Sequence, residues 1–322
     1  MSAEFDVVVI GRNEGRRLPL ALQAAMPQAR RAIYVDSGSH DDSVAQAQAL
    51  GVQVVELDAA RPFSAARARN EGFAALGLNR ADLVQFVDGD CLLDPEWMKT
   101  ARSFLAAHPK AGLVHGRYTE EDPDRSIYNW LTQWEWDKPA GPAASGIGTF
   151  LARSVAFEQT GGFRDTMIAA EDDEMFLRMR RTGWETWSIA APMVRHDVAL
   201  LEFRNWNRRM VRAGHSFAEL GALHDGVARA PRLRALFWGA GLPLLALVLL
   251  LVWPPGLLLV AALYLGSMAR QALRFVRMGL APFRAAQAAA LLMFSKFSNL
   301  VGIASYWLKR FRRQDAQIIE YK

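Results

Sequence analysis

The chain lacks several features that would each point to a known class of protein. Cys91 is the only cysteine among its 322 residues, which excludes an intramolecular disulfide framework and a cysteine-rich zinc or iron–sulfur site. No Walker A loop, GxSxG elbow or HExxH motif occurs, so the enzyme classes that these motifs mark find no support. No basic stretch with a short apolar run opens the chain, and we expect no cleaved secretory signal.

Acidic residues are nearly absent from the end of the chain. Residues 229–322 hold 13 Lys and Arg against only Asp315 and Glu320, whereas residues 1–228 hold 25 basic and 31 acidic residues. The basic residues flank long apolar runs, which is typical of membrane proteins and not of nucleic-acid-binding proteins. We therefore predict a membrane as a partner and no nucleic acid. We divide the chain into a first domain at 1–228 and a membrane-anchoring helical region at 229–322.

The apolar part of the second region predicts a helical hairpin at about residues 236–269. No charged residue lies between Leu236 and Ser267, a run too long for one perpendicular helix across a hydrocarbon core of about 30 Å. Pro254-Pro255 falls near the middle of this run and should end a helix. A buried hairpin of a soluble domain is the alternative, but uncharged runs of this length are rare in soluble cores.

A third apolar stretch, at about residues 285–308, contains Lys296. The insertion of one lysine at the centre of a bilayer has an unfavourable free energy of about 2.5–3.5 kcal/mol. The stretch also has a polar stripe at helical spacing, formed by Ser295, Asn299, Gly302, Tyr306 and Lys309. This pattern favours a helix that lies in the membrane interface or packs on the hairpin, with a third membrane helix as the alternative. Basic residues at every boundary place the chain at the inner membrane, with its first domain on the cytoplasmic side.

Residues 5–118 alternate apolar runs with helical segments. We predict strands at 5–10, 32–35, 52–57, 83–87 and 112–117, and helices at 14–25, 41–50, 64–76 and 95–107, the last with Asp94 as its N-cap. Repeated β–α units predict an α/β fold with a mostly parallel sheet and helices on both faces. Such sheets bind ligands beyond the carboxyl ends of their strands. Polar clusters follow three of the predicted strands, at residues 12–14, 36–39 and 88–90.

The cluster Asp88-Gly89-Asp90 is the candidate metal site. Its two carboxylates follow a buried strand, and the glycine between them permits a tight bend. Carboxylate oxygens suit a hard divalent cation, so we predict Mg²⁺ or Mn²⁺ bridging to a diphosphate. An ordinary Asp-Gly turn is the alternative.

Several segments, in this order, closely resemble the successive motifs of family 2 glycosyltransferases with the GT-A fold. The first four are Val7–Glu14, Val35–Ser43, Ala66–Gly72 and Val87–Asp90. Farther on, Gly161–Asp165 is similar to the Gly-Gly-Phe stretch of the family, and Glu171–Arg178, followed by Thr182–Trp184, is similar to its Glu-Asp acceptor-site helix. The resemblance covers about residues 1–225.

The resemblance implies a role for individual residues. Asn13, Glu14 and Asp36 match positions that contact the nucleoside of a nucleotide sugar. Arg67 or Arg69, ahead of Asn70, would face the nucleotide, and we assign Arg67 and Asn70 to this site. Asp88 matches a position that holds the ribose or the metal, Asp90 matches a metal ligand, and His196 matches a position that contacts the metal or the diphosphate. Asp172 matches the catalytic base, and the adjacent Glu171 is the second candidate for that role.

The resemblance therefore implies a metal-dependent, inverting hexosyl- or N-acetylhexosaminyl-transferase. The processive synthases of the family carry Gln-x-x-Arg-Trp, whereas the nearest segment here, Asn207–Arg212, lacks that Gln and Trp, so we expect transfer of a single sugar. The expected partners are a nucleoside-diphosphate sugar and a polyprenyl-linked saccharide of surface-polysaccharide assembly, with other proteins of that pathway as further candidates. A polyprenyl-phosphate glycosyl synthase and a catalytically silent membrane scaffold are the alternatives.

Overall fold

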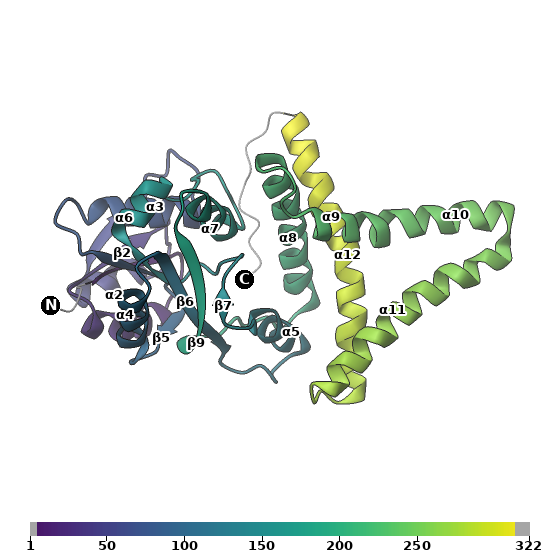
Figure 1. The fold of residues 1–322 in the computed structure, drawn as a ribbon, viewed down its shortest axis with the longest axis horizontal. Helices are drawn as coiled ribbons and strands as arrows, with labels where there is room; N and C mark the ends of the chain where they lie inside the picture. The colour runs from purple at the N-terminus through teal and green to yellow at the C-terminus, as the bar shows by residue number, and fades with distance from the viewer. Residues whose placement is uncertain (1–4, 313–322) are drawn as a thin grey trace. The chain divides into compact units, whose positions relative to one another are not determined.

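A computed structural model describes residues 5–312 (Figure 1). These residues form two compact units. The first contains the chain up to Asp122 together with Thr132–Val198, and the second contains Pro123–Leu131 and the chain from Ala199. Each unit is described by itself below.

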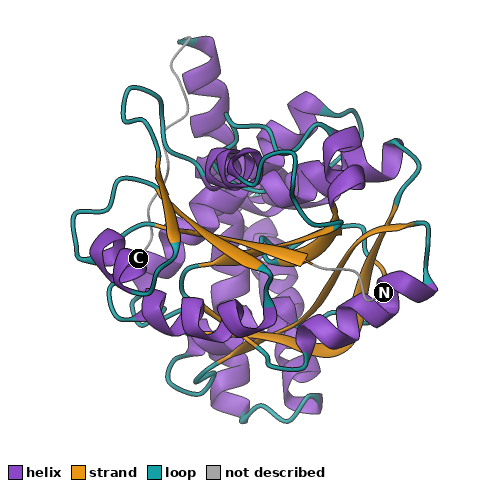
Figure 2. Ribbon diagram, turned by 90° about the vertical axis from the view of Figure 1, so that its left-hand side faces the viewer, coloured by secondary structure: helices purple, strands orange, loops and turns teal. Residues whose placement is uncertain are grey.

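The first unit is built on one sheet in which the strand order is β3-β2-β1-β4-β8-β6-β9-β5, with β7 paired to β9 (Figure 2). β1 pairs in parallel with β2 and β4, β2 with β3, and β6 with β9, whereas β8 and β5 are antiparallel to their neighbours. The strands are β1 (Phe5–Gly11), β2 (Arg31–Asp36), β3 (Gln53–Glu56), β4 (Leu83–Asp88), β5 (Cys91–Leu93), β6 (Ala111–Glu120), β7 (Gly141–Pro142), β8 (Phe150–Arg153) and β9 (Glu185–His196). The predicted α/β fold with a mostly parallel sheet is confirmed.

Helices cover both faces of this sheet. β1 and β4 are apolar along almost their whole length because they are buried on both sides. One face packs on Leu18, Leu22 and Trp97, and the other on a cluster that contains Phe157 and Phe176. The helices of this unit are α1 (Arg17–Ala25), the 3₁₀ turn η1 (Met26–Gln28), α2 (Ser43–Ala49), α3 (Ala65–Ala75), α4 (Trp97–Ala107), α6 (Ser154–Thr160) and α7 (Glu171–Arg181). A further helix, α5 (Ile127–Trp136), belongs to the second unit up to Leu131 and to the first unit from Thr132.

The five strands predicted from the sequence are present, but three helix starts are wrong. The helix expected from residue 41 begins at Ser43, with Asp42 as its N-cap. The helix expected from residue 14 begins at Arg17, after a turn in which the Arg17 amide donates to the Glu14 carbonyl at 3.1 Å. The helix expected from residue 95 begins at Trp97, and its N-cap is Glu96 and not Asp94. The Asp94 side chain instead accepts a hydrogen bond from the Glu96 amide at 2.9 Å. An aspartate side chain commonly accepts from the backbone amide two residues later and so stabilises a turn and not a helix start.

The second unit contains long helices joined by short turns. They are α8 (Phe203–Leu223), α9 (Arg229–Leu236), the π-helical turn η2 (Phe237–Gly241), α10 (Leu242–Val252), the 3₁₀ turn η3 (Pro254–Gly256), α11 (Leu257–Arg277) and α12 (Pro282–Phe311). Within residues 5–312, three segments are long and apolar enough to cross a membrane: Arg229–Val252, Pro254–Arg277 and Pro282–Phe311. As predicted, the two consecutive prolines interrupt the first long apolar run, and α10 and α11 form a hairpin (Figure 1).

The polar stripe of α12 packs mainly on α8, a neighbour that the sequence did not indicate. Ser295, Asn299 and Tyr306 are buried on this face, and the Ser298 hydroxyl donates to the Asn207 side-chain oxygen at 2.6 Å. Large apolar side chains on the other face of α12 are exposed, among them Phe283, Phe294, Val301, Leu308 and Phe311. α12 is therefore an amphipathic helix whose polar side is covered by protein.

Two glycines allow the backbones of α8 and α12 to touch. A Cβ atom on Gly302 would lie 2.0 Å from the Val211 carbonyl oxygen, and one on Gly214 would lie 2.1 Å from the Asn299 carbonyl oxygen. Close approach of small residues is a common way to pack helices in or beside a membrane.

Substitution of Gly302 by alanine should therefore separate the two helices. We expect Gly302→Ala to lower the stability of the unit by about 1–3 kcal/mol, the usual range for an overpacked contact. The matched control is Gly266→Ala in α11, where an added Cβ meets no atom within 4 Å. Thermal unfolding of both variants in the same detergent measures the difference, and equal midpoints would show that α8 and α12 are not in such close contact.

Candidate active site

The predicted polar clusters meet at one edge of the sheet. Asp36 ends β2 beside Gly11, and Asp88 ends β4 beside Ile10, so the two aspartates flank the carboxyl end of β1. The amides of Ser37 and Gly89 donate to carbonyls of β1 at 3.0 and 2.7 Å and fold the following turns over this edge. The parallel register therefore brings together side chains that are far apart in the sequence.

Arg69, on α3, joins two carboxylates at this edge. Its Nη2 atom donates to Asp88 at 2.7 Å and its Nη1 atom to Glu171 at 2.8 Å, while its side chain is 3% exposed. Burial alone would lower the pKa of Arg69, but the charges of Asp88 and Glu171 outweigh this effect and hold it above its ordinary value. Gly148 passes directly over the guanidinium, because a Cβ there would lie 2.1 Å from Nη2.

Asp90 and His196 form the candidate metal centre. Strand pairing places Cys91 opposite His196, which brings the His196 Nε2 atom to 3.0 Å from an Asp90 carboxylate oxygen. The Trp136 ring stacks on the His196 ring with centroids 5.4 Å apart. The ligand atoms of Asp90, Cys91 and His196 all lie within 4.8 Å of one another.

These groups fit the predicted cation. A carboxylate and a neutral imidazole are good ligands for Mn²⁺, and a carboxylate suits Mg²⁺. Asp88, two residues before Asp90, points to Arg69 and keeps a side chain that is 34% exposed. The structure therefore brings Asp90 and His196 together and pairs Asp88 with Arg69.

The acidic first turn of α7 holds the candidate base. Asp172 is partly buried, and burial and the charges of Asp173 and Glu171 raise its pKa. Glu171 is engaged by Arg69, and Asp173 accepts a hydrogen bond from the Gly146 amide at 2.8 Å. Of the four consecutive acids Glu171–Glu174, Asp172 alone makes no side-chain hydrogen bond to another segment within residues 5–312, since its oxygen accepts only from the adjacent Asp173 amide.

The three predicted nucleoside residues lie in the turns after β1 and β2. Asp36 is buried and accepts hydrogen bonds from the Tyr34 hydroxyl and from the amides of Gly38 and Ser39. The side chain of Asn13 accepts from the His40 amide at 2.8 Å, and Glu14 forms an ion pair with Arg17 at 3.1 Å. These contacts join the two turns and shape the edge of the site.

Arg67 and Asn70 are directed into the protein. The Arg67 guanidinium is buried against Glu71 and the carbonyls of Asp58 and Arg61, at 2.6 to 3.0 Å. Asn70 exchanges hydrogen bonds of 2.8 Å with the backbone of Phe163. Arg69 contacts Asp88 and Glu171, whereas Arg67 pairs with Glu71. Trp136, which stacks on His196, lies in no sequence motif and was not predicted as a site residue.

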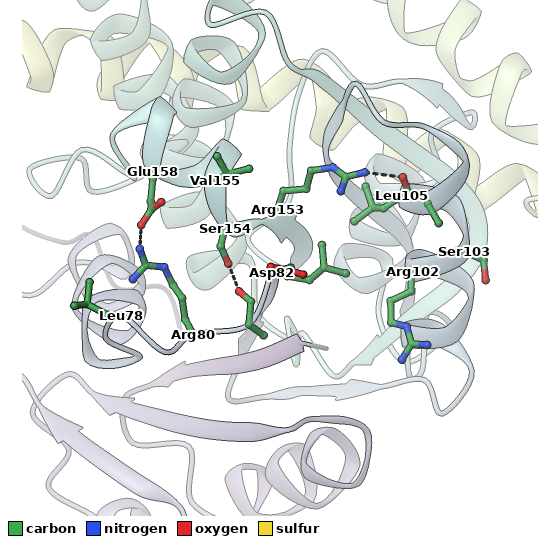
Figure 3. Close-up of a pocket in the computed structure, with 13 residues that line it drawn as sticks. Leu78, Arg80, Asp82, Arg102, Ser103, Leu105, Arg153, Ser154, Val155 and Glu158 are labelled. Atoms are coloured by element: carbon green, nitrogen blue, oxygen red, sulfur yellow. Dashed lines mark hydrogen bonds and ion pairs between the residues drawn. The ribbon is translucent and has the colours of Figure 1, made fainter. Parts of the chain in front are cut away.

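A large cavity lies elsewhere in the first unit. It measures about 650 Å³ and lies at the start of β4 and the end of β8, the opposite ends from Asp88 and Thr149 (Figure 3). Its polar side chains largely bond one another or nearby carbonyls: Arg80 pairs with Glu158, and Arg153 donates to the Leu105 carbonyl at 2.7 Å (Figure 3). None of the predicted site residues lines this cavity.

Comparisons with known proteins relate this chain to glycosyltransferases. Residues 6–161 match the family model described as Glycosyl transferase family 2. The chain is 26% identical over 240 residues to Pre-mycofactocin glycosyltransferase of Mycobacterium tuberculosis, an alignment that covers 69% of this chain and 48% of that protein. The chain thus spans about half the length of the curated relatives it matches.

Solved structures show the same fold. The chain is similar to mannosyltransferase PcManGT from Pyrobaculum calidifontis in complex with GDP-Man and Mn²⁺, with a TM-score of 0.62, 16% identity, and coverage of 94% of this chain and 88% of that chain. It is also similar to S. aureus TarS 1–349 in complex with UDP-GlcNAc, with a TM-score of 0.54, 12% identity, and coverage of 97% and 92%. The first unit therefore has a GT-A-like fold.

Loss of a metal ligand should be measurable apart from catalysis. We expect Asp90→Asn to weaken Mn²⁺ binding at least tenfold, because a neutral amide replaces the charged ligand beside His196. Asp94→Asn is the matched control, since Asp94 only supports a turn before α4. Calorimetric titration with Mn²⁺ compares the two, and unchanged affinity in Asp90→Asn would remove this residue from the metal centre.

Proposed function

We propose that this chain, whose residues 6–161 carry the glycosyl transferase family 2 sequence on a GT-A-like fold, is an inverting glycosyltransferase. It would move one sugar from a nucleoside-diphosphate sugar to a lipid-linked saccharide during surface-polysaccharide biosynthesis. The observation that carries the proposal is the Arg69 bridge, which ties Asp88, at the end of β4, to Glu171, the residue next to Asp172.

The relatives support a nucleotide sugar as the donor and a divalent cation as the cofactor. One similar structure contains GDP-Man and Mn²⁺, and another contains UDP-GlcNAc. In this chain, Asp90 and His196, with Asp88 beside them, would hold Mn²⁺ or Mg²⁺. The bound ion would supply positive charge that stabilises the departing diphosphate.

The remaining donor-side residues shape the nucleotide site. Asn13, Glu14 and Asp36 would border the nucleoside through the two turns that their side chains join. We retain Asn70 and Arg67 as residues that support this side, through the loops they fix, and we add Arg69 as the guanidinium at the site itself.

Asp172 would act on the acceptor. A neutral hydroxyl attacks C1 of the donor sugar, the bond from C1 to the diphosphate breaks, and the carboxylate of Asp172 accepts the hydroxyl proton. Attack from the side opposite the leaving group inverts the configuration at C1. Glu171 is the weaker candidate for this role, because Arg69 already holds its carboxylate.

The helical part would bring the enzyme to its lipid acceptor. Long apolar helices expose Leu244, Leu251, Leu258 and Leu265, among other side chains. From residue 229 to residue 312 every charged side chain is basic, as expected of a segment beside anionic lipids. We propose a catalytic domain at residues 1–228 on the cytoplasmic side of the inner membrane and an anchoring region at 229–322.

The decisive assay is transfer itself. Membranes that contain the protein are incubated with labelled UDP- and GDP-sugars, and lipids are then extracted. Label on a lipid-linked oligosaccharide is the expected result. Label on polyprenyl phosphate would instead identify a glycosyl synthase, and absence of transfer from every donor, with the fold intact, would favour a silent scaffold.

Replacement of Asp172 separates the base from residues that only bind. We expect Asp172→Asn to lower turnover by about 10²–10⁴ while donor affinity stays the same, because the amide cannot accept the proton. The raised pKa of Asp172 also predicts that wild-type activity falls, as pH decreases, well above the pH at which an ordinary aspartate is protonated.

The matched control is Asp137→Asn, which neutralises an exposed aspartate just after α5. Turnover and donor binding are measured from pH 5 to 9 for the wild type and for the variants Asp172→Asn, Glu171→Gln and Asp137→Asn. If Asp172→Asn turns over normally and Glu171→Gln does not, the base is Glu171 and the assignment on α7 is one residue out of register.

A further inference from the structure

Two aromatic rings of the first unit contact the imidazole of His196. The Trp136 ring stacks on the imidazole, with centroids 5.4 Å apart and planes 29° apart. The Tyr118 ring meets the imidazole edge to face, with centroids 6.5 Å apart, and it also contacts the Trp136 ring at 5.3 Å. The three rings therefore form one cluster around a residue of the candidate metal centre.

Strand pairing places Tyr118 in this cluster. β6 and β9 run in parallel, with Tyr118 opposite Val194 and Glu120 opposite His196. Because side chains alternate between the two faces of a strand, Tyr118 and His196 lie on the same face of the sheet. Tyr118 is 4% exposed, and its hydroxyl accepts a hydrogen bond from the Thr149 amide at 3.1 Å. The backbone register and burial therefore fix the Tyr118 ring.

Hydrogen bonds from Gln133 hold the end of α5, and with it Trp136, against β6. The Gln133 side-chain oxygen accepts from the Glu120 amide at 2.7 Å, and its side-chain amide donates to the Tyr118 carbonyl at 3.4 Å. Residues three apart share one side of a helix, so Trp136 lies on the same side of α5 as Gln133. Trp136 is half-buried and packs against the hydrophobic cluster that contains Tyr118.

The carboxylate of Asp90 is fixed through both of its oxygens. One oxygen lies 3.0 Å from the Nε2 atom of His196, and the other accepts a hydrogen bond from the Cys91 thiol at 3.8 Å. The Asp90 side chain is only 6% exposed. A cation that binds Asp90 would therefore meet His196 only if the imidazole keeps its present orientation.

The orientation of an imidazole decides whether it can bind a metal. The lone pair of Nε2 lies in the plane of the ring, so a turn about the bond between Cβ and Cγ directs it away from the cation. This torsion has a broad energy profile in histidine, and neighbouring groups must therefore fix it. Contacts of this kind behind a metal ligand commonly raise its affinity for the metal. The indole of Trp136, stacked on the ring face, opposes such a turn.

We infer that Trp136 is a positioning residue of the candidate metal centre, whose indole holds the His196 imidazole in the plane in which Nε2 faces Asp90. The inference rests on the proposed function, from which it takes the divalent cofactor. Trp136 itself binds neither the cation nor the substrates in this account. Tyr118 is a less suitable residue to test, because Thr149 links it to Asp88: the Asp88 amide donates to the Thr149 hydroxyl at 3.4 Å.

The test measures the affinity of the full chain in lipid nanodiscs for Mn²⁺ alone, by calorimetric titration. We expect Trp136→Ala to weaken binding about 10- to 100-fold, the usual effect of losing a contact behind a metal ligand. Trp136→Phe should stay within about threefold of the wild type, because a phenyl ring can also stack on the imidazole. Trp187→Ala is the matched control, since it removes another half-buried indole that contacts an imidazole, that of His108 at 5.6 Å.

A double-mutant cycle separates positioning from a general effect on the fold. If Trp136 acts through His196, replacing both by alanine should weaken Mn²⁺ binding no more than His196→Ala does alone. Residues that act independently would instead give losses that add.

A second readout needs no metal. With ¹⁵N-labelled histidine, the His196 ring should give one sharp set of NMR signals in the wild type and in Trp136→Phe. These signals should broaden in Trp136→Ala, because the ring then exchanges between orientations, while the width of the His108 signals should not change.

Unchanged Mn²⁺ affinity in Trp136→Ala, an equal loss in Trp136→Phe, additive losses in the double variant, or sharp His196 signals in Trp136→Ala would each overturn the inference. Sugar transfer by a protein that shows none of the expected effects would refute the inference alone. The expected Mn²⁺ results in a protein that transfers no sugar would leave the inference standing and refute the proposed function alone.

Discussion

The site depends on the buried guanidinium of Arg69. A charged arginine is stable in the interior only when opposite charges accompany it, and here Asp88 and Glu171 supply them from a strand end and a helix start. Removing one partner of such a buried pair typically costs about 3–5 kcal/mol. The bridge therefore fixes the end of β4 relative to the first turn of α7, and any ligand that binds between them meets a preformed arrangement of charge.

The contacts of the neighbouring residues distinguish the candidate base from the candidate metal ligands. Glu171 is held by Arg69 and Asp173 by the Gly146 amide, which leaves Asp172 as the acid best able to take a proton. On the other side, the pairing of β5 with β9 sets Asp90 against His196, so backbone register and not loop geometry places the candidate metal ligands. Gly148 serves the same arrangement, because any side chain there would displace Arg69.

Much of the sheet and of the candidate site could be predicted from the sequence, because apolar runs followed by polar clusters indicate buried strands and their exposed ends. Arg67 and Arg69 could not be separated in this way, since both are buried arginines on one short helix and only tertiary contacts show which of them meets Asp88. The polar stripe of α12 could be read from the sequence, but its partner α8 could not. A polar stripe indicates that one face of a helix is covered, but it does not identify the element that covers it.

The central claim is that Arg69 and its two carboxylates act as one unit in sugar transfer. A double-mutant cycle of Arg69→Met and Glu171→Gln, with turnover of the active nucleotide sugar as the readout, tests it most directly. Interacting residues give non-additive effects, whereas independent ones add. We predict that the double variant is no slower than Arg69→Met alone, because the loss of the guanidinium already breaks the bridge. Losses that simply add would show that the two residues act separately and would contradict the account.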